Sequence, residues 1–82
     1  MRVRWLRKAL SNLDAEASYI ATEDPASARV VVTRVLAAVD LLSRQPGLGR
    51  PGRVPGTREL VVSHTRYIVP YRVRGGQVEV LR

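Results

Sequence analysis

The chain has no cysteine and only one histidine among its 82 residues. Without thiols it can form neither a disulfide framework nor a thiolate zinc site, and one histidine among scattered carboxylates gives no metal-ligand spacing. We therefore expect no metal and no cofactor. The segment from Met1 to Trp5 lacks the apolar stretch of a signal peptide, and no window approaches the roughly 20 apolar residues of a membrane span. These absences predict a cytoplasmic protein that makes no membrane contact.

Acidic residues are also few: seven stand against 14 basic ones, which gives a net charge of +7. The excess is uneven, because residues 44–82 hold eight arginines and two glutamates, a net of +6. A basic surface of this kind indicates an anionic partner, either nucleic acid or an acidic protein. The fact that 13 of the 14 basic residues are arginine has a second explanation, a GC-rich genome, which accounts for it as well as an anionic partner does. Genome composition would not explain why the arginines cluster in residues 44–82.

The hydrophobic pattern predicts one domain over residues 1–82, since a chain this short can bury only one core. Residues 1–5 alternate polar and apolar side chains as a strand does, and from Leu6 the apolar spacing changes to three and four. This spacing predicts a helix near 6–23 and a second helix over 25–45. Asp24 and Pro25 separate the two helices, because Asp caps a helix and Pro is tolerated in its first turn.

The C-terminal half reads as strands and turns. Residues 46–57 hold four Gly and three Pro and are expected to form no regular element. Strands are expected over 57–62 and 67–74, and a Gly75-Gly76 turn should lead into a further strand. That turn sets a register in which Arg72 faces Glu79. Pro70 cannot donate a hydrogen bond, so it predicts a sheet edge or a bulge at that position.

Together these elements predict an α+β fold: an N-terminal strand, an antiparallel helix hairpin and a three-stranded antiparallel meander, with residues 3–5 joining the sheet. The apolar stripes of the two helices include Leu10 and Leu36, and Val73 belongs to the apolar face of the last hairpin. The residues expected at the centre of the core are Leu13, Ile20, Val35, Leu42, Val69 and Val78.

Several segments resemble the ParE/RelE superfamily of bacterial toxins, on the ParE side, over nearly the whole chain. Leu42 to Gly49 resembles its L-x-x-x-P-x-x-G stretch, and Leu13-Asp14 with Ser18 to Ala21 resembles its L-D-x-I-x-x-Y-I-A stretch. The strongest likeness is GTRELVV at 56–62, YIVPYRV at 67–73 and VEVLR at 78–82. The resemblance implies the toxin of a type II toxin–antitoxin pair. The family normally adds a V-x-H and a basic-aromatic tail, on which toxicity often depends, and the sequence ends at Arg82, before both; residues 1–82 are therefore expected to lack that tail.

Two activities follow from the resemblance. A RelE-like toxin cuts mRNA on the ribosome, which needs basic side chains converging to stabilise charge and move protons. In RelE nucleases an Arg follows the Tyr that opens this strand, whereas this chain has Ile68 there. The nuclease alternative would depend on Arg58, Arg66, Arg82 and His64.

A ParE-like toxin instead binds a protein target, by resemblance DNA gyrase, and breaks no bond itself. The residues expected to contact the target or the antitoxin are Arg50, Arg53, Arg58, Arg72 and Arg82. Simpler structural roles also fit several candidates: Arg72 as the cross-strand partner of Glu79, His64 as an exposed turn residue, and Tyr67 and Tyr71 as core aromatics.

A third possibility is an inactive copy that serves only as a scaffold for an antitoxin. In every version the resemblance implies a cognate antitoxin with an acidic segment that is partly disordered when free and folds on the toxin. The exposed parts of the helix hairpin and the basic face of the sheet are the expected contact surfaces.

Overall fold

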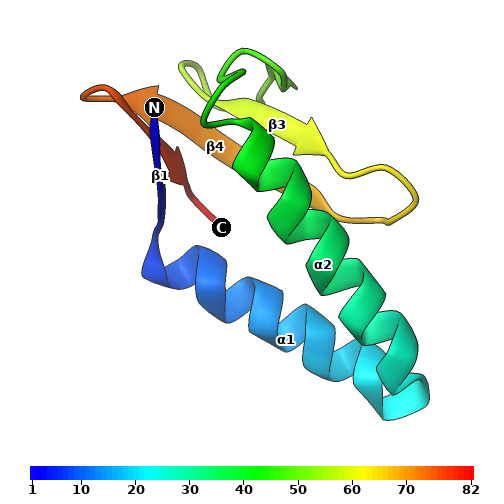
Figure 1. Ribbon diagram of the computed structural model, residues 1–82. Helices are drawn as coiled ribbons and strands as arrows, with labels where there is room; N and C mark the ends of the chain where they lie inside the picture. The colour runs from blue at the N-terminus through cyan, green and yellow to red at the C-terminus, as the bar shows by residue number, and fades with distance from the viewer.

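The structure is a computed structural model that describes all of residues 1–82 (Figure 1). It has an α+β fold with two helices on one side of a five-stranded sheet of order β1-β5-β4-β3-β2. No helix is long and apolar enough to cross a membrane. In chain order the elements are β1 (Arg2–Trp5), α1 (Arg7–Glu23), α2 (Pro25–Leu41), β2 (Arg50–Pro51), β3 (Arg58–Val61), β4 (Ile68–Arg74) and β5 (Gln77–Val80).

The sheet is mixed. Strands β3, β4 and β5 form the predicted antiparallel meander, while β1 lies beside β5 and runs parallel to it, with Val3 opposite Val78. Where the chain leaves β1, the backbone N–H of Leu6 donates to the carbonyl of Val80 at 3.0 Å. The two ends of the chain therefore meet in neighbouring strands of the sheet.

The helix hairpin turns at Asp24, as predicted. The Asp24 side chain accepts hydrogen bonds from the Ser27 N–H at 3.1 Å and from the Ser27 hydroxyl at 2.7 Å, while Pro25 opens α2. These two bonds hold the pKa of Asp24 below its ordinary value, because they favour the charged carboxylate. The aspartate is thus an N-cap that also benefits from the helix dipole.

The second helix is shorter than the predicted span 25–45. It ends at Leu41, and the Ser43 hydroxyl donates to the carbonyl of Asp40 at 2.8 Å in the turn that follows. Pro46 also disfavours helical geometry in the residue before it. The apolar spacing continues to Leu42, the C-cap of α2, whose backbone angles are still helical but whose N–H donates to the carbonyl three residues back, that of Val39, at 2.9 Å.

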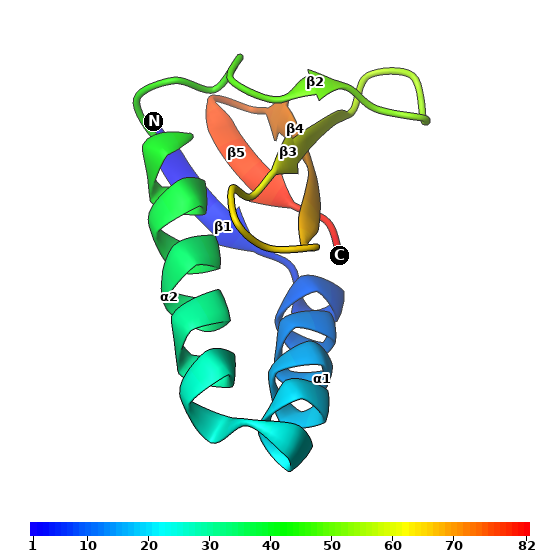
Figure 2. The ribbon, with the colours of Figure 1, turned by 90° about the vertical axis from the view of Figure 1, so that its right-hand side faces the viewer.

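The prediction that residues 46–57 contain no regular element is wrong at one point. Arg50 and Pro51 form the short strand β2, opposite Glu59 and Arg58 of β3, at the outer edge of the sheet (Figure 2). Pro51 is compatible with this place, since an edge strand can lack one N–H without breaking the ladder. The pairing carries only two residues, which is why the composition of the loop did not reveal it.

Pro70 lies neither at an edge nor in a bulge, contrary to the prediction; it sits in β4, between β3 and β5. Its opposite residue in β3 is Glu59. Along an antiparallel ladder, hydrogen-bonded and non-hydrogen-bonded pairs alternate, and the pair of Val62 and Tyr67 is hydrogen-bonded. Counting along the ladder makes Glu59 and Pro70 a non-hydrogen-bonded pair, so β3 needs no N–H from Pro70. Toward β5, its carbonyl accepts from the N–H of Leu81 at 2.9 Å. The missing N–H therefore removes one bond at the last pair of the ladder.

The register of the last hairpin is confirmed: Arg72 faces Glu79 and Val73 faces Val78. Gly75 and Gly76 have φ values of +59° and +73°, the positive angles that a type I′ turn needs. The core between helices and sheet is built around the side chains Ala9, Leu13, Val35, Val39, Leu42, Leu60, Val62, Val69, Tyr71, Val78 and Val80.

Five of the six residues expected at the centre of the core are buried, and Ile20 is only half-buried. Leu10, Leu36 and Val73, which were also placed on buried faces, are exposed. Leu10 and Leu36 follow the buried Ala9 and Val35 by one residue, so they point about 100° away around the helix. Val73 adjoins the turn at the end of the hairpin.

Candidate interface on the open face of the sheet

One face of the sheet carries the helices, and the other carries none. Buried residues of β4 such as Val69 and Tyr71 point toward the helices, so their neighbours Pro70 and Arg72 point to the opposite face. The paired residue Glu79 in β5 lies on that same open face. The alternation of strand side chains therefore gives this face its polar and basic character.

A hollow of about 200 Å³ on the open face brings three arginines together. Arg53 comes from the loop after β2, Arg72 from the middle of β4, and Arg82 from the segment after β5. We call this hollow the arginine pocket. Its remaining lining residues are Val54, Thr57, Glu59, Pro70 and Leu81.

Arg72 is held in place by Glu79. Its Nε donates to Glu79 Oε1 at 2.7 Å, and a second guanidinium, that of Arg4, lies 3.9 Å from the other carboxylate oxygen. Glu79 is 7% exposed, and the hydrogen bond from Arg72 holds the pKa of its carboxyl below the ordinary value. An arginine fixed at Nε still presents its two terminal nitrogens, so Arg72 is oriented before any ligand arrives.

This ion pair makes stability depend on pH in a defined direction. Because the pKa of Glu79 is lower in the folded than in the unfolded chain, its contribution is present above the ordinary pKa of 4.5 and is lost as the pH falls through the folded-state value. We expect the melting temperature to fall on acidification below that pH, and to fall less in Glu79→Gln. Thermal unfolding followed by circular dichroism measures this, with Glu23→Gln at the exposed end of α1 as the control. An equal acid response in Glu79→Gln and the wild type would contradict the assignment.

The other two arginines of the pocket are not neutralised. Arg53 and Arg82 are exposed and make no ion pair, and the pocket's one carboxylate, Glu59, is bonded to Arg50 at 3.3 Å. Guanidinium groups bind carboxylate or phosphate oxygens in a bidentate manner. The arrangement can therefore bind an anionic group, and it contains no His, Lys or Tyr side chain that could move a proton.

Arg58 has a structural contact instead. Its Nη1 donates to the carbonyl of Gly49 at 2.8 Å, while the Tyr71 hydroxyl accepts from the Gly49 N–H at 2.8 Å and donates to the carbonyl of Pro46 at 2.7 Å. Side chains from β3 and β4 thus clamp the start of the loop. Tyr71 is a core aromatic with a satisfied hydroxyl, as predicted. A loop fixed at Pro46–Gly49 is better able to hold Arg50 and Arg53 over the open face.

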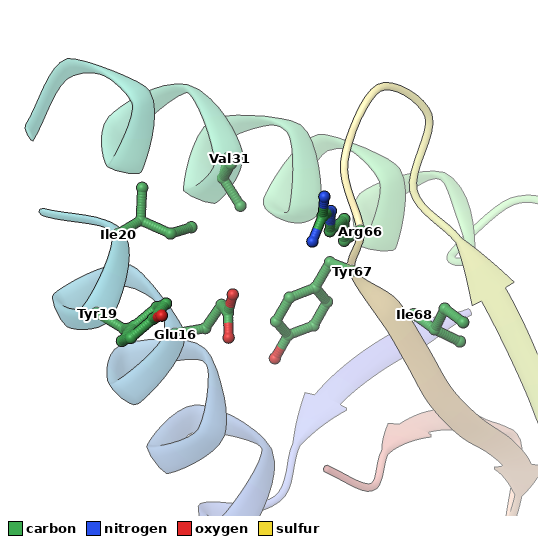
Figure 3. A pocket seen from close by; sticks show the side chains of 7 residues that line it. All are labelled: Glu16, Tyr19, Ile20, Val31, Arg66, Tyr67 and Ile68. Atoms are coloured by element: carbon green, nitrogen blue, oxygen red, sulfur yellow. The ribbon is translucent and has the colours of Figure 1, made fainter. Parts of the chain in front are cut away.

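Arg66 lies elsewhere, in a hollow between the helix hairpin and the start of β4 (Figure 3). Glu16 projects toward it from α1 and Val31 from α2, with Arg66 and Tyr67 on the strand side. Burial, and then the charge of Glu16, raise the pKa of the Tyr67 hydroxyl above its ordinary value. A tyrosine with a raised pKa keeps its proton at neutral pH and is a poor base.

His64 stands in the turn between β3 and β4 with a left-handed backbone, at φ +61°. Its side chain is exposed and lines none of the hollows described above. This position agrees with a turn residue, since His is among the residue types enriched at positive φ. No three His, Asp or Glu side chains gather in a way that would hold a metal ion.

The model of a protein family described as the ParE toxin of the type II toxin-antitoxin system parDE matches residues 3–82. The chain belongs to this family of toxins. The ParE-family toxin is 48% identical over 80 residues to toxin Y4kP of Sinorhizobium fredii, across 98% of the chain and 82% of that protein. It is also 35% identical over 81 residues to toxin RelE2 of Caulobacter vibrioides, across 99% of the chain and 90% of that protein.

A solved structure titled as the chromosomal ParDE TA system of P. aeruginosa contains a chain with the same fold as this ParE-family toxin. The TM-score is 0.90 at 33% sequence identity, over 100% of the toxin and 91% of that chain. The recognition of a ParE/RelE-type toxin from the sequence motifs is thereby confirmed, as is the α+β fold that the resemblance implied.

Within the toxin, the nuclease candidates Arg58, Arg66, Arg82 and His64 lie at four separate places. The contact candidates Arg53, Arg72 and Arg82 do come together. Two contacts could not be predicted from the sequence: Glu59 as the pocket's carboxylate and Arg4 as the second partner of Glu79. Strand alternation put both residues on a polar face, but their contacts depend on β1 lying beside β5 and on β2 lying beside β3.

Proposed function

We propose that this ParE-family toxin inhibits growth by binding a protein target, by resemblance DNA gyrase, and that a cognate acidic antitoxin neutralises it. The arginine pocket is the contact surface that this proposal assigns to the target. Arg53 and Arg82 would bind carboxylates of the target directly, and Arg72 would bind from a position fixed by Glu79. The toxin would then act through an equilibrium of binding and break no bond.

The observation that carries this proposal is the composition of the pocket. Its three cations are accompanied by no His, Lys or Tyr, and Arg58 and Arg66 point to other parts of the molecule. RNA cleavage by attack of a 2′-hydroxyl requires a group to take up that proton. Glu59 is the one carboxylate in reach, and it is already engaged with Arg50.

The test of target binding is inhibition of gyrase supercoiling by the purified toxin. The double variant Arg53→Glu/Arg82→Glu should raise the half-inhibitory concentration by about tenfold to a hundredfold, the effect of losing a charged contact. The double variant Arg7→Glu/Arg44→Glu, at exposed positions outside the pocket, makes the same change of net charge and should change little. If this control loses inhibition to the same degree, net charge alone explains binding and the pocket has no special role.

Neutralisation is tested with the purified acidic protein encoded by the gene that adjoins the toxin gene. Binding to the folded state alone stabilises it, so a saturating amount should raise the melting temperature, by about 2.7 kcal/mol of free energy at 100 times the dissociation constant. An unchanged melting temperature would contradict the proposed pairing. Tight antitoxin binding without any effect on gyrase would leave the toxin as a scaffold only.

A further inference from the structure

Strand β1 brings two further arginines to the open face of the sheet. Val3 and Trp5 of β1 pack against the core, so Arg2 and Arg4, which alternate with them along the strand, point to the open face. Both arginines are exposed, and neither lines the arginine pocket. The basic character of the open face therefore extends well beyond the pocket.

Two arginines of β4 match those of β1, with β5 lying between the two strands. The first row of side chains across the three strands is Arg4, Glu79 and Arg72, and the second row is Arg2, Gln77 and Arg74. We call the four arginines of these rows the β1–β4 patch. Neighbouring strands lie about 4.8 Å apart and each residue rises by about 3.3 Å, so the arginine positions are about 7 Å apart along a strand and about 10 Å apart across β5.

The two rows contain one acid, Glu79, which neutralises only part of their charge. Glu79 is 7% exposed, and its carboxylate lies 2.7 Å from the guanidinium of Arg72 and 3.9 Å from that of Arg4. Arg2 and Arg74 are exposed and form no ion pair. Four positive charges against one negative charge leave a net charge of +3 on this part of the sheet. The patch therefore presents an excess of cations, two of them held in place, to an anionic ligand.

The two rows include no apolar and no aromatic side chain, which narrows the class of ligand. The centre of a protein–protein interface is apolar and enriched in aromatic residues. Single-stranded nucleic acids are held by bases that stack on aromatic side chains. The aromatic residues of this chain lie elsewhere: Trp5, Tyr67 and Tyr71 pack in the core, and Tyr19 lies on α1. Contacts to the backbone of duplex DNA need no such side chains, because arginine binds phosphate oxygens directly.

We propose that the β1–β4 patch binds the phosphate backbone of double-stranded DNA. Arg2 and Arg74 would each contact a phosphate through a guanidinium group that has no ion-pair partner in the protein. Arg4 and Arg72 would donate the N–H groups that Glu79 leaves unused. Contacts to phosphates carry no sequence information, so the toxin should bind duplexes of any sequence. This ligand lies beyond the proposed function, since the toxin would bind it in the absence of any protein target.

Binding is measured by the fluorescence anisotropy of a short labelled duplex of arbitrary sequence as the salt concentration is raised. Each phosphate contact contributes about 0.9 to the slope of log affinity against log salt concentration. Arg2→Gln/Arg74→Gln should therefore reduce this slope by about 1.8 and raise the dissociation constant by at least about tenfold. A wild-type toxin that leaves the duplex unbound at low salt would overturn the proposal.

The matched control is Arg29→Gln/Arg34→Gln on α2, which makes the same change of net charge. Both residues are exposed and form no ion pair, and α2 lies on the helix side of the sheet, away from the open face (Figure 1). This control should keep the slope and nearly the affinity of the wild type. Equal losses in the two double variants would overturn the patch, since net charge alone would then explain binding. Melting temperatures within about 5 °C of the wild type confirm that each variant is folded.

Two further probes separate duplex DNA from other anions. Single-stranded RNA of the same length has a lower charge density and should bind more weakly than the duplex, and tighter binding of the RNA would overturn the proposal. Polyglutamate offers carboxylates in place of phosphates and should not displace the duplex at equal charge concentration. Displacement would assign the patch to an acidic protein and overturn its assignment to DNA. A toxin that inhibits gyrase without binding the duplex would overturn the patch alone, whereas duplex binding without inhibition of gyrase would overturn the proposed function alone.

Discussion

Shortening Leu42 to alanine should destabilise the toxin by about 2–5 kcal/mol, the cost of removing a large buried side chain and leaving a cavity. Leu42 is 0% exposed and packs in the cluster that joins α2 to the sheet. Small domains have total stabilities of about 5–15 kcal/mol, and a chain of this length is near the lower end. The variant should therefore be largely unfolded in mild denaturant.

Equilibrium urea unfolding followed by circular dichroism measures this effect. Leu36→Ala is the matched control, since the side chain of Leu36 is 48% exposed on α2, the helix that ends just before Leu42. Its loss should change the free energy of unfolding by less than about 1 kcal/mol. A small effect at Leu42, or equal effects at both positions, would contradict the packing described between α2 and the sheet.

Replacing Tyr71 by phenylalanine should cost about 1–3 kcal/mol, because it leaves the Gly49 N–H and the Pro46 carbonyl without their buried partner. Tyr67→Phe is the matched control, since the Tyr67 hydroxyl makes no hydrogen bond in the structure. Exchange of the Gly49 amide should accelerate in Tyr71→Phe alone. Equal stabilities of the two variants would contradict the clamp.

Gly49→Ala tests the same contact from the other side. A Cβ atom at this position would lie 2.6 Å from Tyr71 Cε1 and 2.9 Å from the carbonyl oxygen of Glu59. Both neighbours belong to the sheet, so the loop must move, at a cost of about 1–3 kcal/mol. Gly47→Ala, which meets nothing within 4 Å, is the control. Tolerance of Gly49→Ala would mean that the loop is not held against Tyr71.

The elements that could be predicted from the sequence are those fixed by local chemistry. Two glycines at 75–76 set the turn type and thereby the whole register of the last hairpin, including the pair of Arg72 and Glu79. Asp24 and Pro25 set the boundary between the helices in the same way. In both cases neighbouring residues along the chain decide the geometry.

The features that escaped prediction depend on residues far apart in the sequence. Pro70 is tolerated in an inner strand because its pair with Glu59 in β3 is a non-hydrogen-bonded one, and because β5 ends beside it. The sequence could not show that Arg58 donates to the carbonyl of Gly49, because this contact depends on how the loop folds back against β3. The exposed apolar residues of α2, such as Leu36, could not be told from the buried ones, because spacing does not show how much of a helix the sheet covers.

The geometry also changes how functional variants should be interpreted. Arg58→Ala removes a clamp on the loop that carries Arg50 and Arg53, so a loss of toxicity in that variant has a structural explanation. Arg53 and Arg82 are exposed and make no ion pair, so we expect their replacement to leave the fold intact. These two positions are the informative ones for the arginine pocket.

Primer extension on translated mRNA in the presence of the full-length toxin decides between binding and RNA cleavage. We expect intact transcripts at toxin concentrations that inhibit gyrase supercoiling, with inhibition weakened in Arg53→Glu/Arg82→Glu. Codon-dependent cuts in the mRNA that disappear with Arg82→Ala would contradict this expectation and make the toxin a ribonuclease.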